Sequence, residues 1–226
     1  MFMPALGETL YPARHRLAMA LVLSLALAPA IGIGPLAFDS YGQLVIAIIK
    51  EVTIGVWIGL VGRIILSGLQ FAGYQIGMVS GLANAFAPQM GSFEGATMVS
   101  TGLMLGAIAM IFATDLHHVI IEAVLLSYRV FPVGQLMIAD MTQQIIRAVS
   151  ESFYIGLAVS APFFVMGFLM NLGLGLANRM MPNLPVFFVA APILIISGFS
   201  VLVIAAPHML REFGARFAEW LGLLTF

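Results

Sequence analysis

The sequence has 226 residues, of which 62% are hydrophobic and only 8% are charged. Soluble globular domains carry about 25% charged residues, so this composition predicts a membrane protein. A formal net charge of −1 provides no overall field that would attract nucleic acid or an acidic partner. The absence of cysteine excludes thiolate catalysis, disulfides and cysteine-ligated zinc. The length fits a single domain, residues 1–226, built from several membrane helices.

The first apolar run, residues 17–38, is long enough to cross a bilayer, but prolines and glycines interrupt its second half. A short helix followed by an irregular connection is expected there. Residues 43–70 have the length and periodicity of a helix, although they include Lys50, Glu51 and Arg63. Residues 71–95 are rich in glycine and side-chain amides, a composition that predicts the end of that helix and then a loop.

Three further long apolar segments follow. Residues 96–128 predict one continuous helix, residues 140–176 another, and residues 186–206 a last membrane-length run ahead of an amphipathic tail at 207–226. The predicted class is therefore an all-α membrane protein with about five long apolar helical segments. Arginines between the segments define no consistent positive side. Either some segments are half-spanning hairpins, or the chain is not a simple serpentine bundle in lipid.

One apolar stretch, FATDLHHVII at residues 112–121, contains an aspartate and two histidines. On a regular helix, Asp115, His118 and Glu122 share a sector with Arg129, and we name these four residues the polar stripe. His117 would point to the other side of that helix. A charge at bilayer depth costs at least ~2.5–3.5 kcal/mol, so the polar stripe is expected to be buried against protein or to face water.

Three roles compete for the polar stripe. Structural ion pairing that sets helix register is the favoured interpretation, and a proton relay is chemically feasible because histidine titrates near neutrality. A metal site is disfavoured, because the sequence has neither the H-E-x-x-H order of zinc proteases nor paired E-x-x-H helices. No metal ligand and no cofactor are therefore predicted.

Glycines recur at helical spacing in two places. Gly55, Gly59 and Gly62 line one side of the second apolar segment, and another series follows at four-residue intervals: Gly73, Gly77 and Gly81. Stripes of small residues let helix backbones approach closely where lipid removes the hydrophobic drive for association. Packing within the chain and contact with other subunits are both consistent with these stripes.

A loop of amides, aromatics and methionine lies between apolar helices, and it comprises Asn84, Phe86, Pro88, Gln89, Met90 and Phe93. Methionine and phenylalanine can form a deformable seal that excludes water, whereas a plain surface loop would need no such side chains. The sequence contains no Walker A motif, nucleophile elbow or dinucleotide-binding fingerprint, and an enzyme is not predicted.

Three segments together resemble one known family over nearly the whole chain: EVTIGVWIGLVGRIILSGLQFAGYQIGMVSGLANAF, FATDLHHVIIEAVLLSYRVFPVG and NLGLGLANRMMPNLPVFFVAAPILIISG. That family is the FliR proteins of flagellar export gates, whose counterparts in virulence secretion are the SctT proteins. The most specific positions include Glu51, Gly55, Gly59 and Arg63 in the first segment, and Asn178, Arg179 and Pro182 in the third. With the glycines above, these positions are expected to serve helix packing and assembly.

The resemblance implies a non-enzymatic channel subunit that assembles with FliP- and FliQ-family proteins and with the FlhB-family switch protein. It also implies a flagellar basal body in the bacterial inner membrane, unfolded flagellar proteins as cargo, and kinked hairpins as the fold. Residues 71–95 correspond to the family's plug region. Family members usually carry one more apolar helix before the stretch from Pro4 to Arg16, so about one membrane-length segment is expected to be lacking.

One alternative comes from a different class. A proton-coupled transporter of small solutes could use Asp115, His118 and Glu122 as its relay.

Overall fold

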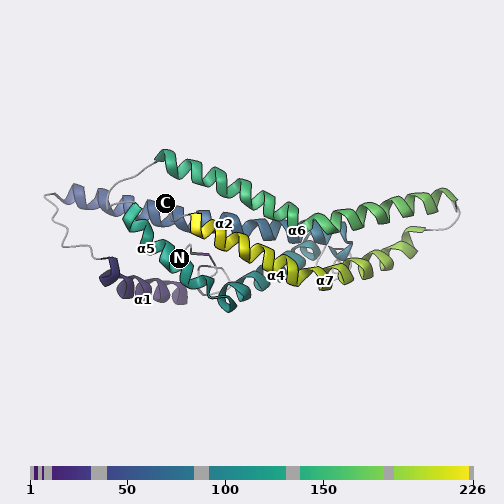
Figure 1. Cartoon of the computed structure of the whole chain (residues 1–226), viewed down its shortest axis with the longest axis horizontal. Helices are drawn as coiled ribbons and strands as arrows, with labels where there is room; N and C mark the ends of the chain where they lie inside the picture. Colours follow the sequence, from purple (N-terminus) through teal and green to yellow (C-terminus); the bar gives the residue numbers. More distant parts are fainter. Residues whose placement is uncertain are drawn as a thin grey trace. The chain divides into compact units, whose positions relative to one another are not determined.

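The computed structural model describes residues 3–4, 7, 12–31, 40–83, 92–130, 138–180 and 186–223, without the side chains at 92–97, 129–130, 186–189 and 223. Every principal element in these ranges is a helix, and Figure 1 shows them along the chain. They are α1 (Ala13–Ile31), α2 (Tyr41–Val79), α4 (Ser92–Ala113), α5 (Leu116–Val130), α6 (Ile138–Met180) and α7 (Val186–Leu223). The all-α prediction is confirmed.

Within the described ranges, four helices are long and apolar enough to cross a membrane: α1, α2, α6 and the part of α7 from Ala190 to Gly222. The pair α4 and α5 adds a fifth candidate span if the two are counted together, and the axes of its two parts differ by 78°. Such lengths follow from the bilayer, because a helix needs about 20 apolar residues to cross its hydrocarbon core. The predicted number of about five apolar segments therefore agrees with the structure.

The helix predicted over residues 43–70 extends further, as α2 to Val79, so it ends within residues 71–95, where its end was predicted. The helix predicted as continuous over 96–128 is broken between Ala113 and Leu116. The predicted tail at 207–226 is not a separate element over its described residues, because α7 runs through Pro192 and Pro207 to Leu223.

The chain divides into two compact units. Unit 1 comprises Met1–Leu66, Ile111–Ser150 and Arg216–Phe226, and unit 2 comprises Ser67–Met110 and Glu151–Ala215. The boundary between the units falls inside α2, α4, α6 and α7. Each of these long helices therefore contributes to two separate cores.

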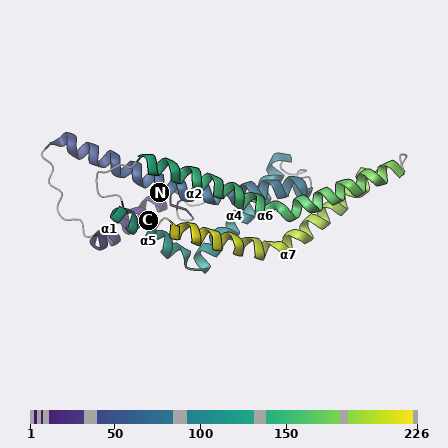
Figure 2. The ribbon, with the colours of Figure 1, turned by 45° about the horizontal axis from the view of Figure 1, so that its top comes forward.

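In unit 2, the parts of α6 and α7 that precede and follow residues 181–185 lie side by side (Figure 2). The part of α2 in this unit crosses α6 at two glycines. A Cβ at Gly68 would collide with the backbone carbonyl of Ser152, and a Cβ at Gly156 would lie 2.5 Å from the ring of Phe71. Close backbone approach through small residues is the usual way for helices to associate in lipid.

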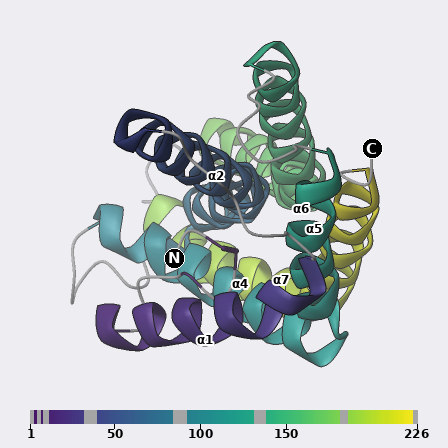
Figure 3. The same cartoon turned by 90° about the vertical axis from the view of Figure 1, so that its left-hand side faces the viewer.

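In unit 1, α1 contacts α5, as Figure 3 shows. No residue of α1 is buried, although the helix is apolar throughout. Farther along the chain, Trp57 of α2 donates its indole N–H to the carbonyl of Met141 in α6, over 3.1 Å. This buried hydrogen bond fixes the first part of α6 against α2, and nothing in the sequence pattern had indicated it.

Candidate functional site

Asp115 lies at the interruption between helices α4 and α5. Its φ is 58°, in the left-handed region that few residues other than glycine adopt. Its N–H donates to the carbonyl of Phe112 over 3.4 Å, and its own carbonyl accepts from the N–H of His118 over 3.0 Å. Aspartate tolerates this conformation better than most residues do. The chain can therefore turn here without glycine, and the prediction of one regular helix through Asp115 was wrong.

The break rearranges the polar stripe. His117 was expected to point away from Asp115 and His118, and that prediction was also wrong, because the rings of His117 and His118 lie 4.1 Å apart between centroids. The Nδ1 atom of His118 lies 3.8 Å from a carboxylate oxygen of Asp115. The ligand atoms of Asp115, His117 and His118 all lie within 4.8 Å of one another. These three residues could hold a metal ion, and we name them the helix-break cluster.

Burial of the polar stripe by partner helices stays a prediction. Within the chain alone, the side chains of Asp115 and His118 are 78% and 66% exposed, and Glu122 is exposed as well. The side chain of Arg129 lies outside the described part of the structure. Exposed charges at membrane depth are costly, so this surface needs protein or water beside it.

The second glycine stripe packs within the chain at its first position. A Cβ at Gly73 would collide with the Cα of Ser100 on α4, and the hydroxyl of Ser100 donates to the carbonyl of Gln70 over 3.0 Å. Gly77 is buried. Gly81 lies beyond the end of α2 with φ 70°, and a Cβ there would lie 2.9 Å from the side chain of Leu194. Intramolecular packing therefore explains Gly73 and Gly81.

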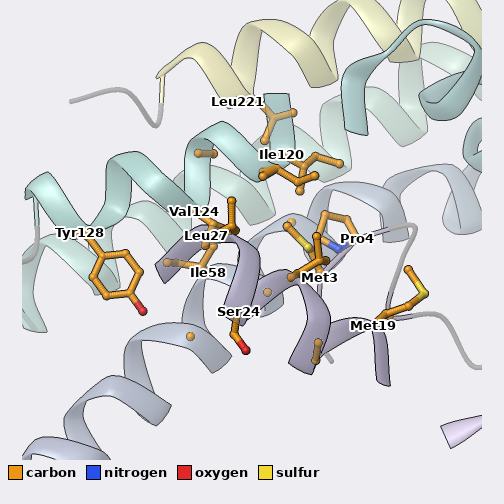
Figure 4. Close-up of a pocket in the computed structure, with 18 of the residues that line it drawn as sticks. Met3, Pro4, Met19, Ser24, Leu27, Ile58, Ile120, Val124, Tyr128 and Leu221 are labelled. Atoms are coloured by element: carbon orange, nitrogen blue, oxygen red, sulfur yellow. The ribbon is translucent and has the colours of Figure 1, made fainter. Parts of the chain in front are cut away.

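The first glycine stripe borders an apolar cavity of about 420 Å³ in unit 1 (Figure 4). Pro4 covers Gly62, where a Cβ would lie 2.8 Å from the proline ring, whereas a Cβ at Gly55 would meet nothing within 4 Å. Gly59 is buried at the cavity wall. Figure 4 shows that the other wall residues include Met19, Leu27, Ile58, Ile120, Val124 and Leu221.

Two arginines hold the start of the chain beside this cavity. Nη2 of Arg63 donates to the carbonyl of Gly7 over 2.6 Å, and Nη1 of Arg16 donates to the same carbonyl over 3.2 Å. Hydrogen bonds from charged donors are among the stronger ones in proteins. Arg63 therefore contacts Gly7 within unit 1, and its predicted part in assembly stays a prediction. Arg16, which was not predicted, contacts the same carbonyl.

The remaining predicted residues are scattered. Glu51 is half-buried on α2, and Asn178 and Arg179 are exposed in the last turn of α6, where a cation complements the helix dipole. Pro182 and the plug residues Asn84, Phe86, Pro88, Gln89 and Met90 lie outside the described residues, as does the side chain of Phe93. A second apolar cavity of about 340 Å³ lies in unit 2, and Leu82, Met98 and Phe199 are among the residues that line it.

Large apolar side chains on α6 and α7 are exposed over several turns, among them Val165, Phe168, Leu172, Ile196 and Ile204. A soluble domain rarely exposes apolar patches on this scale. Together with the membrane-length helices, these faces define an all-α, multi-pass membrane protein.

The model of the family described as "Bacterial export proteins, family 1" matches residues 1–220. The flagellar biosynthetic protein FliR of Caulobacter vibrioides is 35% identical over 228 residues, covering 100% of this chain and 90% of that protein. FliR of Escherichia coli K12 is 24% identical, and the match covers 98% of this chain and 85% of that protein. The Yop proteins translocation protein T of Yersinia pestis is 30% identical, and the match covers 84% of this chain and 74% of that protein. The chain belongs to this family of bacterial export proteins, among the FliR proteins.

Proposed function

We propose that the chain is a non-enzymatic subunit of the flagellar type III export gate, in the bacterial inner membrane. It forms part of the channel through which unfolded flagellar proteins leave the cytoplasm. The observation that carries this proposal is the full-length match to the flagellar FliR of Caulobacter vibrioides. The comparisons offer no support for the alternative of a proton-coupled transporter of small solutes.

The partners that we propose are FliP- and FliQ-family subunits and the FlhB-family switch protein. The exposed apolar faces of α6 and α7 support such an assembly, because an apolar helix face in a membrane contacts either lipid or another helix. Asn178 and Arg179 are exposed at the end of α6 and are available for contact with another subunit. Under this proposal, the polar stripe is also covered by neighbouring helices, which would remove its cost in lipid.

We further propose that residues 84–93 help to seal the channel until cargo passes. The support is compositional: Phe86 and Met90, between α2 and α4, and Phe93, in the first turn of α4, combine large apolar volume with adaptable shape.

Secretion of flagellar proteins tests the function directly. In a strain without this gene, hook and filament proteins should accumulate in the cells and be missing from the medium, and a plasmid copy should restore their export. A strain that secretes these proteins normally without the gene would show that the chain is not a necessary part of the gate. Total expression of the same proteins in the cells serves as the control.

A further inference from the structure

We propose that the helix-break cluster of Asp115, His117 and His118 is a binding site for a divalent transition metal ion of the zinc type. The three side chains supply two imidazoles and one carboxylate, ligands that suit zinc and its neighbours better than magnesium or calcium. The inference rests on the geometry at the break, and it holds whether or not the chain acts in an export gate.

The three ligand residues lie close together at the helix break. All three ligand atoms lie within 4.8 Å of one another, and Nδ1 of His118 is already 3.8 Å from the carboxylate of Asp115. Ligands around tetrahedral zinc lie roughly 3.3 Å apart, given zinc–ligand bonds of about 2.0–2.2 Å. The Asp115 and His118 side chains are largely exposed and can rotate to bring their ligand atoms closer.

A second observation concerns His117. Its Nδ1 atom is buried and has no hydrogen-bond partner, while its ring packs against Phe112 at 5.3 Å and against His118 at 4.1 Å between centroids. Buried polar atoms in native structures almost always have a partner, and an orphan calls for a bound water or ion. A metal ion held beside His118 and Asp115 would supply that partner.

The backbone at the site gives the metal a structural role. Asp115 occupies the left-handed region at the break, and His117 and His118 lie in the first turn of α5. A metal ion bound by all three would tie the break to the start of α5 and hold the bend between α4 and α5 in place. Three protein ligands leave a fourth position for water or for a group from a neighbouring subunit.

The test uses the full chain in detergent, purified with an affinity tag that contains no histidine and stripped of metal. Zinc content per chain is measured by mass spectrometry after one equivalent is added and free metal is removed. Cobalt(II) then reports geometry, because tetrahedral coordination gives intense visible absorption bands. We expect one ion per chain, tetrahedral cobalt bands and a higher unfolding temperature with zinc.

Two variants test the ligands Asp115 and His118, and two others serve as controls. Asp115→Asn keeps a residue that tolerates the left-handed region but removes the charge, and His118→Gln removes an imidazole; both should lose the ion, the cobalt bands and the rise in unfolding temperature. Glu122→Gln and His208→Gln are matched controls, because both residues are exposed outside the cluster, and they should bind as the wild type does. Absence of stoichiometric zinc from the wild type would overturn the proposal, as would full binding by His118→Gln.

Discussion

Asp115 determines where α4 ends. Periodicity predicted that polar residues occur together near residue 115, but it could not predict their directions, because those depend on a single left-handed backbone angle. Aspartate is common within helices and also tolerates the left-handed region, so its identity alone does not distinguish the two states. The contact between the His117 and His118 rings lies within the first turn of α5, and it was missed because periodicity does not predict side-chain conformation.

Replacement of Asp115 by valine tests the importance of this angle. A β-branched side chain is strongly disfavoured at positive φ, so Asp115→Val should destabilise the chain by about 1–2 kcal/mol relative to Asp115→Asn. The measurement is the thermal unfolding midpoint in detergent without added metal, which separates the backbone effect from any metal effect. Equal midpoints for the two variants would show that residue 115 does not adopt the left-handed conformation.

At the scale of the helices, the sequence predicted their number and type well and their boundaries less well. The long apolar runs predicted α6 and α7, because a helix satisfies every backbone polar group within its own membrane segment. The glycines at residues 71–79 left the position of the helix end open, because glycine lowers helix propensity by about 1 kcal/mol relative to alanine. In α2, close packing of Gly73 against α4 compensates for that cost, and such packing is invisible in a local window.

Two glycines on α2, one packed and one facing open space, test this explanation. Gly73→Ala should destabilise the chain by about 1–3 kcal/mol, because its Cβ meets the backbone of Ser100, which cannot move cheaply. Gly55→Ala faces open space and should leave stability unchanged or raise it by about 0.5–1 kcal/mol. Unfolding midpoints of both variants in detergent are the measurement. A Gly73→Ala chain as stable as Gly55→Ala would contradict the observed contact.

At the scale of the whole molecule, the exposed side chains of Asp115, His118 and Glu122 need protein or water beside them in an apolar chain. The family could be inferred from the sequence because its characteristic residues occur in order along nearly the whole chain, and the match to residues 1–220 confirms it. The partners stay a proposal, because a surface shows that it needs covering and not which protein covers it.

The proposed seal leads to a prediction at this scale. Deletion of residues 87–91 should leave the complex assembled but make the membrane leaky to small ions, because Met90 and its neighbours would no longer fill the channel. Ion conductance of the purified complex in planar bilayers is the measurement. Met90→Leu, which keeps the apolar volume, should stay closed and serves as the control. An assembled deletion complex with unchanged conductance would refute the sealing role.

Native mass spectrometry of the chain extracted gently from its own membrane tests the central proposal most directly. The chain should be recovered in a stable complex with FliP- and FliQ-family subunits, and that complex should survive detergent exchange. Recovery of the intact chain alone, in cells that express both partner families, would contradict its assignment to the export gate.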